Sequence, residues 1–310
     1  MRIIYYDRNV KLDECAVALG FFDGVHAGHR ALIGRCTEEA EKRSLMSCVF
    51  TFVSEDDNLK SSSERLYSTE EKLRLIEDMG VDCAVVARLS DIKDYTPECF
   101  VRQILTGQLN ARLTLCGYNF RYGKGAEGNC QTLTEQMRAL GLDSVILDKI
   151  TFEGREVSTT EIKRLLAEGD IEEANRLLKI PYHIEGTVEH GLGVGRLHGF
   201  PTVNLSLQNS VKLKLGVYRS AVSVGGSIYH GLTNVGVCPT VQEREVHAET
   251  TILDFDSDVY GERIEVYLLG YVREEKKFGS IDELKEQIEK DKIKAKEENG
   301  ESLWQVIGRK

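Results

Sequence analysis

The sequence changes its pattern once, near residue 180, and this change limits the fold more than any other feature. Before it, short apolar segments alternate with segments of helical periodicity; after it, β-rich segments follow one another across glycine-containing turns. Strands separated by helices predict a parallel sheet covered on both faces, whereas consecutive short strands predict an antiparallel barrel or sandwich. We therefore expect two domains, residues 1–180 and 181–310.

The first domain is expected to be an α/β domain in which strands and helices alternate. The expected strands are Ala16–Phe22, Ser47–Phe52, Cys83–Leu89, Leu113–Cys116 and Ser144–Leu147. The expected helices are Arg30–Lys42, Thr69–Met79, Pro97–Thr106, Leu133–Leu140, Thr160–Glu168 and Ile171–Leu178. Ser68 and Glu71 have the spacing of a capping box, and Ser280 with Glu283 repeats it before a last helix.

Charge and cysteine placement argue against several kinds of protein. The formal net charge of −10 disfavours a nucleic-acid partner, because such a protein needs a basic face for the phosphate backbone. No apolar signal region or membrane-length run is present, so we expect a cytoplasmic protein without a membrane partner. The eight cysteines are scattered, which predicts reduced, mostly buried thiols rather than a zinc site or a disulfide framework.

The segment GFFDGVHAGH places two histidines where the first helix should begin. Ligands of parallel sheets bind at the carboxyl ends of strands, and the N-terminus of a helix attracts anions. His26 and His29 lie one turn apart, and Gly24 and Gly28 leave room for a phosphate near the backbone. Phosphate binding, metal binding and two solvated histidines all stay open at this point, although no third metal ligand lies nearby.

A second glycine-containing segment, GLGVGRLHGFPTVNL, starts the second domain. It is not a dinucleotide fingerprint, because Phe200 and Pro201 prevent a regular helix, and it lacks the Gly-Lys-Ser/Thr ending of a phosphate loop. Thr202 and Asn204 alternate by two, so their oxygens point to one face of an extended segment. Hydroxyl and amide oxygens suit Mg²⁺ beside nucleotide phosphates, but a strand without a metal has the same generic pattern.

Three segments of the first domain resemble the HxGH nucleotidylyltransferases, and specifically the bacterial FAD synthetases. They are FFDGVHAGH, CGYNFRYGKGAEGN and VSTTEIKRLLAEGDIEEANRLL, in the order of that family. The resemblance implies a Rossmann-like nucleotidylyltransferase domain in which His26 and His29 hold ATP phosphates while the FMN phosphate attacks. It also implies that Asn119 contacts the flavin substrate and that a second helix start binds phosphate. The residues of that helix start are Ser158, Thr159, Thr160 and Lys163.

The second domain resembles the riboflavin kinases from Tyr182 to Asp291. GRLHGFPTVNL is similar to the G-R-x-x-G-F-P-T-A-N-L segment of that family, and later segments such as HAETTILDF follow in order. The resemblance implies a six-stranded antiparallel β-barrel with a terminal helix, and ATP with Mg²⁺ under the glycine loop. The implied ATP-binding residues are Gly191, Gly193, Gly195 and Arg196, with Thr202 and Asn204 on the metal. Glu249 would be the catalytic base, and Arg273 and Phe278 would contact the flavin.

Together the two resemblances predict a bifunctional enzyme of flavin cofactor biosynthesis. It would phosphorylate riboflavin to FMN and adenylylate FMN to FAD with release of pyrophosphate, using ATP and Mg²⁺ in both steps. The oligomeric state is not predicted.

Two departures from the family pattern keep an alternative open. TFVSEDDN replaces the usual T-F-x-P-H-P, so that Asp56 and Asp57 stand where they could repel a phosphate. Lys163 replaces an arginine, which removes a bidentate phosphate contact. The alternatives are a monofunctional riboflavin kinase with an inactive N-terminal domain and a non-catalytic flavin- or nucleotide-binding regulator.

Overall fold

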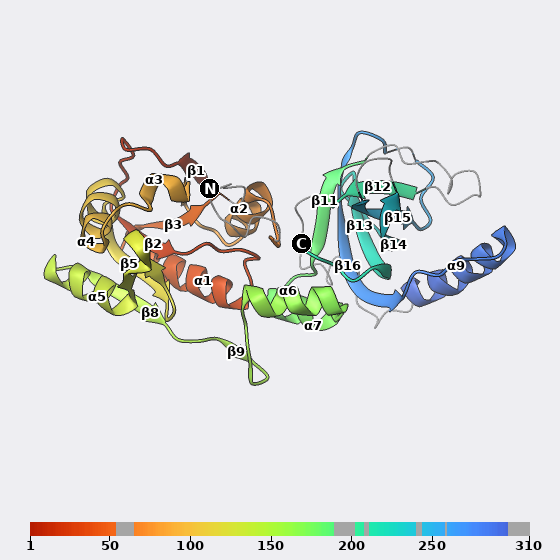
Figure 1. The fold of residues 1–310 in the computed structure, drawn as a ribbon. Coiled ribbons are helices and arrows are strands. Elements are labelled where there is room, and N and C mark those ends of the chain that lie inside the picture. The colour runs from red at the N-terminus through yellow and green to blue at the C-terminus, as the bar shows by residue number, and fades with distance from the viewer. Residues whose placement is uncertain (54–64, 189–201, 208–210, 240–243, 258, 297–310) are drawn as a thin grey trace. The chain divides into compact units, whose positions relative to one another are not determined.

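The computed structural model describes residues 1–53, 65–188, 202–207, 211–239, 244–257 and 259–296. These residues form two compact units, Met1–Thr159 and Thr160–Lys310 (Figure 1). Helices α6 (Thr159–Glu168) and α7 (Ile171–Leu178) are predicted as part of the first domain, but they pack almost entirely within the second unit. Asn175 shows why, because its Nδ2 donates to Leu268 O at 2.9 Å and its Oδ1 accepts from Tyr182 N at 2.7 Å. The functional boundary between residues 180 and 181 stays a prediction.

A six-stranded parallel sheet forms the first unit and confirms the predicted α/β class. Its strands run in the order β1–β4–β3–β2–β5–β8. They are β1 (Arg2–Tyr5), β2 (Cys15–Leu19), β3 (Met46–Phe52), β4 (Cys83–Ala87), β5 (Ala111–Gly117) and β8 (Asp143–Leu147). The chain builds outward from β2 through β3 to β4 and then returns to place β5 on the other side of β2. In open α/β sheets, ligands bind at such a reversal of strand order, beyond the carboxyl ends of the strands.

The edge strand β1 is absent from the predicted strands. Its residues RIIY are mostly exposed, and it pairs with β4 at the border of the sheet. In β2 and β4, by contrast, every residue is buried, which gives the continuous apolar runs that the sequence pattern detects.

The helices of the first unit include the four predicted there, one of them with a different type, and add a short one whose first residue, Leu89, falls in the predicted strand Cys83–Leu89. They are α1 (Ala27–Lys42), α2 (Thr69–Glu77), α3 (Leu89–Ile92), α4 (Pro97–Cys99), the π-helical η1 (Phe100–Gln108) and α5 (Cys130–Ala139). The Ser68–Glu71 capping box is confirmed at α2, with bonds of 3.2 and 2.7 Å between each side chain and the other's amide. The predicted α-helix at Pro97–Thr106 is mostly π-helical, because hydrophobic periodicity does not distinguish the wider turn.

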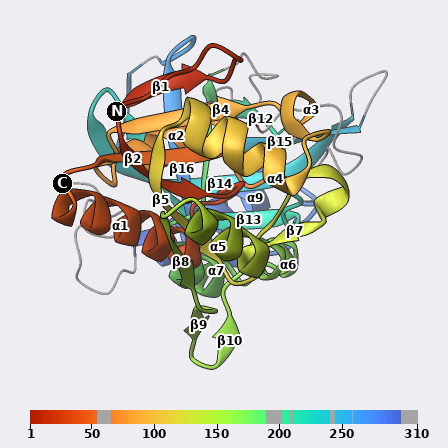
Figure 2. The ribbon, with the colours of Figure 1, turned by 90° about the vertical axis from the view of Figure 1, so that its left-hand side faces the viewer.

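Short elements complete this unit. β6 (Arg121–Tyr122) pairs with β7 (Gly128–Asn129) around the short helix η2 (Lys124–Ala126). β9 (Thr151–Phe152) and β10 (Arg155–Glu156) form a hairpin that extends away from the parallel sheet (Figure 2).

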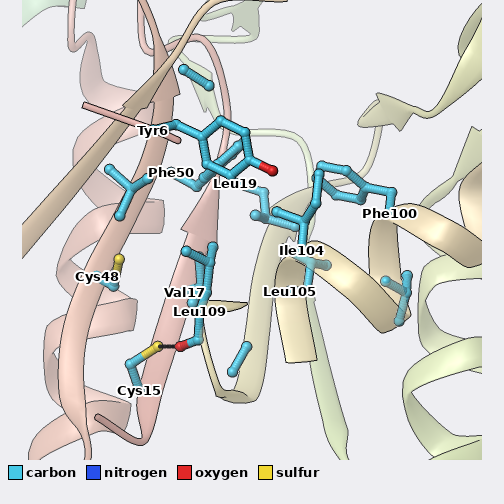
Figure 3. Packing of buried hydrophobic residues seen from close by; sticks show 14 of the residues in the cluster. Tyr6, Cys15, Val17, Leu19, Cys48, Phe50, Phe100, Ile104, Leu105 and Leu109 are labelled. Carbon is cyan, nitrogen blue, oxygen red and sulfur yellow. Dashed lines mark hydrogen bonds between the residues drawn. The ribbon is translucent and has the colours of Figure 1, made fainter. Parts of the chain in front are cut away.

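The core of the first unit lies between the parallel sheet and helix η1. Figure 3 shows Val17 and Leu19 of β2 beside Ile104 and Leu105 of η1. The Cys15 thiol donates to Leu109 O at 2.9 Å in the same layer. The predicted buried thiols are confirmed for the free cysteines Cys15, Cys36, Cys48, Cys83 and Cys116, whereas Cys99 and Cys130 are half-buried.

A six-stranded antiparallel sheet forms the second unit and confirms the predicted barrel. The order is β11–β16–β13–β14–β15–β12, and the edge strands β11 and β12 lie close enough to bring the sheet near closure. The strands are β11 (His183–Thr187), β12 (Thr202–Ser206), β13 (Gly216–Val224), β14 (Ser227–Pro239), β15 (Arg244–Ile252) and β16 (Arg263–Arg273).

The terminal helix α9 (Ile281–Lys296) packs against β13 and β14. Among the helices that the structure describes, none has both the length and the hydropathy to cross a membrane.

Candidate active sites

The loop between β2 and α1 lies at the carboxyl end of the parallel sheet and has an unusual backbone. Phe22, Gly24 and Val25 have φ values of 54°, 83° and 41°, in the left-handed region that only glycine adopts readily. Phe22 and Val25 are fully buried, with 0% of each exposed. Non-glycine residues keep such conformations only where their surroundings fix them, and they are concentrated at functional sites.

His26 ends this loop and caps helix α1. Its Nδ1 accepts a hydrogen bond from His29 N at 3.3 Å, and the two rings stack with their centroids 3.7 Å apart. Because Nδ1 accepts, the neutral His26 ring carries its proton on Nε2 and can donate it to an anion. Gly28 allows this packing, since a Cβ there would lie 3.2 Å from His26 Cε1.

Burial keeps both imidazoles uncharged at neutral pH. Loss of hydration lowers the pKa of His26 to about 4. Loss of hydration also lowers the pKa of His29 well below 6.5, and repulsion from a protonated His26 and from Lys72 acts in the same direction. A phosphate would oppose these effects, because a nearby negative charge favours the protonated ring. The pair therefore offers neutral N–H donors that gain proton affinity when an anion binds.

This depressed pKa predicts a loss of stability in mild acid. Between pH 6.5 and about 4 the unfolded chain binds a proton at His26 that the folded chain does not, so the free energy of unfolding falls as the pH falls. The difference between the two pKa values corresponds to on the order of 3 kcal/mol. The protection of β2 amide hydrogens against exchange, corrected for intrinsic rates, should therefore be lower at pH 4 than at pH 7. In His26→Asn this difference in protection should be smaller. Equal protection at pH 7 and pH 4 would contradict the prediction.

Two other predicted residues lie at the same edge of the sheet. Thr159 Oγ1 donates to Asp23 O at 3.0 Å, and Asp23 Oδ1 accepts from Leu66 N at 3.1 Å. Asp23 thus links Thr159 and Leu66 to the β2–α1 loop within the first unit. Asn119 lies two residues after the end of β5 and is exposed. Since β2 and β5 are adjacent, Asn119 and the histidine pair lie where the strand order reverses.

The remaining predicted residues of the first site have different positions. Ser158 directly precedes α6, whereas Thr160 and Lys163 lie on α6 within the second unit. Asp56 and Asp57 lie outside the described residues, as do Gly191, Gly193, Gly195 and Arg196 of the glycine loop.

The second unit contains a pocket of about 190 Å³ over one face of strands β12, β15 and β14. Four predicted residues line it: Thr202, Glu249, Arg273 and Phe278. The opposite face of the strands carries buried hydroxyls, which form a ladder from Ser220 through Thr233 to Thr250 with bonds of 2.8 and 2.9 Å.

Glu249 lies at the centre of a polar row across three strands, of which Glu249 and Asn234 line the pocket and the predicted Asn204 does not. Asn204 of β12 and Asn234 of β14 are its direct cross-strand partners, so the three side chains lie on one face. Thr202 Oγ1 donates to Glu249 Oε1 at 2.7 Å, which leaves lone pairs of the hydroxyl oxygen for another partner. The pocket therefore combines a carboxylate with neutral oxygen ligands.

Arg273 is fixed at the other wall of the pocket by Asp291. The Asp291 carboxylate on α9 is 1% exposed and accepts from Arg273 Nε at 2.9 Å and from Gln287 Nε2 at 2.9 Å. The guanidinium carbon lies 5.9 Å from the centre of the Phe278 ring, within the range of a cation–π contact. An arginine beside an aromatic ring can hold a planar apolar ligand with polar edges.

Sequence reasoning missed Asn234, Asp291 and Lys72, the last a buried lysine near His29. A signal existed for Asp291, because it falls on the stripe of α9 that also carries Leu284, Ile288 and Ala295. A carboxylate on the apolar stripe of a helix requires a buried partner. For Asn234, the alternation along β14 identifies the face, but only the register with β15 shows that it opposes Glu249.

We expect Asp291→Asn to raise the KM for riboflavin, the flavin that the resemblance implies for this pocket, about tenfold. The reason is that a hydrogen bond between charged groups contributes roughly 1.5–3 kcal/mol. Steady-state kinetics measures this, with the exposed Glu286→Gln on the same helix as control. An unchanged KM in a folded Asp291→Asn variant would show that Arg273 needs no such support.

Comparison with known proteins finds a family model for each half of the chain and relatives over almost its whole length. A family model for FAD synthetase matches residues 9–161, and one for riboflavin kinase matches residues 178–298. A bifunctional riboflavin kinase/FMN adenylyltransferase of Bacillus subtilis (strain 168) is 35% identical over 291 residues, covering 91% of this chain and 92% of the relative. One from Escherichia coli (strain K12) is 35% identical over 290 residues, covering 92% and 93%.

One solved structure has the same fold over nearly the whole chain. A macrolide-efflux protein from Streptococcus pneumoniae superposes with a TM-score of 0.88 at 26% identity, covering 96% of this chain and 100% of that one. The sequence matches agree with the predicted resemblances. The chain belongs to the bifunctional riboflavin kinase/FMN adenylyltransferase family, with an FAD synthetase domain followed by a riboflavin kinase domain.

Proposed function

We propose that the histidine pair of the first unit and the Glu249 pocket of the second catalyse the two steps of FAD synthesis. The observation that carries this assignment is that each family match contains one of the two sites: residues 9–161 include His26 and His29, and residues 178–298 include Glu249. Riboflavin, FMN and ATP are the small-molecule substrates that follow from the family.

In the kinase step, Glu249 is the general base. It accepts the proton of the terminal ribityl hydroxyl as that oxygen attacks the γ-phosphorus of ATP, and ADP leaves. The bond from Thr202 orients the carboxylate, so one lone-pair direction stays available for the substrate hydroxyl. Arg273 and Phe278 hold the flavin ring at the opposite wall of the pocket.

Thr202 and Asn204 are the proposed ligands of Mg²⁺. A hydroxyl and an amide oxygen on one strand face, with a carboxylate opposite, form the oxygen donor set that this ion prefers beside nucleotide phosphates. When bound, the ion would neutralise phosphate charge. Gly191, Gly193, Gly195 and Arg196 are proposed to cover the same ATP molecule.

In the adenylyl transfer step, the first unit supplies donors rather than a nucleophile. An oxygen of the FMN phosphate attacks the α-phosphorus of ATP, and the bond to the β-phosphate breaks to release pyrophosphate. His26 Nε2–H and the His29 ring donate to phosphate oxygens, where charge builds up. The start of α1 with Gly24 and Gly28, and Ser158 with Thr159, complete the phosphate site, and Asn119 contacts FMN. The phosphate contacts of Thr160 and Lys163 remain predictions from the resemblance.

The position of the radioactive label in ATP tests both steps in one preparation. With riboflavin and γ-labelled ATP, we expect label in FMN; with FMN and α-labelled ATP, we expect label in FAD. Both should stop when a chelator removes Mg²⁺. Label in FMN but never in FAD would favour the kinase with an inactive first domain, which the EDDN segment and Lys163 suggested. No label in either flavin would favour the non-catalytic regulator.

The cytoplasmic location and the lack of nucleic-acid partners remain predictions from the sequence.

A further inference from the structure

Helix α2 buries a lysine at the carboxyl end of the parallel sheet. Lys72 is only 3% exposed. Its Nζ donates to Phe52 O, at the end of β3, at 2.5 Å and to Phe21 O, in the loop after β2, at 3.2 Å. Lysine is almost never buried this deeply unless it is paired, and removing its charge from water costs several kcal/mol. A methionine would fill a similar volume without that cost, so packing alone does not account for Lys72.

The two carbonyls bound by Lys72 fix the start of the loop that carries the histidines. Phe21 O also accepts from Thr51 Oγ1 at 2.9 Å, so donors from α2 and from β3 meet on one atom. The left-handed conformation begins at the next residue, Phe22. This anchor therefore lies where the strained loop leaves the sheet, a few residues before His26.

The charge of Lys72 also reaches the second histidine. It contributes to the low pKa of His29, in the same direction as burial and as His26. A buried ammonium bound to two carbonyls keeps a fixed position, so its field at the histidine pair is also fixed. Lys72 thus acts on the pair both through the backbone and through its charge.

We infer that Lys72 is a positioning residue for adenylyl transfer, which holds the carboxyl ends of β2 and β3 together so that the His26–His29 pair keeps its geometry. This inference rests on the proposed role of the two histidines. A misplacement of reacting groups by about 1 Å can cost about 10²-fold in rate.

The test is FAD formation by Lys72→Met in the full chain. We expect kcat for FMN adenylylation to fall roughly 10- to 100-fold. Riboflavin phosphorylation by the same preparation should stay within about twofold of the parent and so reports on folding of the second unit. The exposed Lys93→Met, in the same unit, should leave both reactions unchanged.

A second readout separates positioning from a purely structural role. In Lys72→Met, an NMR titration of His29 should give a higher pKa than in the parent, because a positive neighbour has been removed. A parent-like adenylylation rate would overturn the inference. The inference would also be overturned if the adenylylation rate fell only in proportion to a loss of amide protection in β2 while the pKa of His29 stayed unchanged.

If Lys72→Met does not fold, Thr51→Val decides the question. It removes one of the two donors to Phe21 O without touching a charge. We expect adenylylation to slow roughly three- to tenfold, whereas an unchanged rate would overturn the inference. His29→Ala, run beside these variants, tests the proposed function separately: if it still forms FAD at the parent rate, the role of the histidines fails whatever Lys72→Met does.

Discussion

Replacing Glu249 by glutamine is expected to lower the rate of riboflavin phosphorylation by roughly 10²–10⁴, the usual contribution of a general base. The amide keeps the size of the side chain and can still accept the bond from Thr202, but it cannot accept the substrate proton. The cross-strand neighbours of Glu249, Asn204 and Asn234, are uncharged, so the loss of the carboxylate charge should leave the fold of the pocket intact.

Two measurements make this prediction specific. FAD formation from FMN by the Glu249→Gln chain should equal that of the parent, since the first unit is unchanged. ATP binding, measured by calorimetry, should remain. Glu262→Gln, an exposed carboxylate of the same unit, serves as control and should keep full kinase activity. Phosphorylation by Glu249→Gln at the parent rate would show that Glu249 is not the general base.

Replacing His29 by alanine is expected to lower FAD formation from FMN by roughly 10²–10³, the loss seen when one donor to a developing negative charge is removed. The capping bond of α1 remains in this variant, because it uses the His29 backbone amide and the His26 ring, whereas the stacking of the two rings is lost. Riboflavin phosphorylation should not change.

His26→Asn is the matched partner of that variant. Asparagine is a favourable N-cap residue, so the start of α1 should keep its stability, whereas the Nε2–H donor is lost. We expect a similar fall in FAD formation without a change in the thermal midpoint. If His26→Asn and His29→Ala both retain adenylylation, the phosphate site does not lie at the histidine pair.

The sequence predicts the fold well wherever the signal is local. Buried runs such as CAVAL and CAVVA identify the central strands of the parallel sheet, and the capping box identifies the start of α2. The period of two in TVN identifies the face of β12 that carries Thr202 and Asn204. Each of these signals depends on neighbours within a few residues.

Other features depend on contacts between distant residues and leave no such signal. Lys72 stands in TEEKLRLIE, where a lysine next to two glutamates predicts an exposed side chain. Only the position of α2 over the ends of β2 and β3 buries it. The support of Arg273 by Asp291 joins two segments whose contact requires the fold of α9 over the barrel. Edge strand β1 is exposed, and its pairing with β4 follows from tertiary structure.

A separated-product assay shows whether one chain carries out both reactions. Purified protein with ATP and Mg²⁺ receives riboflavin in one tube and FMN in another, and chromatography resolves the flavins over time. We expect FMN followed by FAD in the first tube and FAD in the second. If FMN accumulates in the first tube and the FMN in the second tube stays unchanged, the protein is a riboflavin kinase with an inactive first domain.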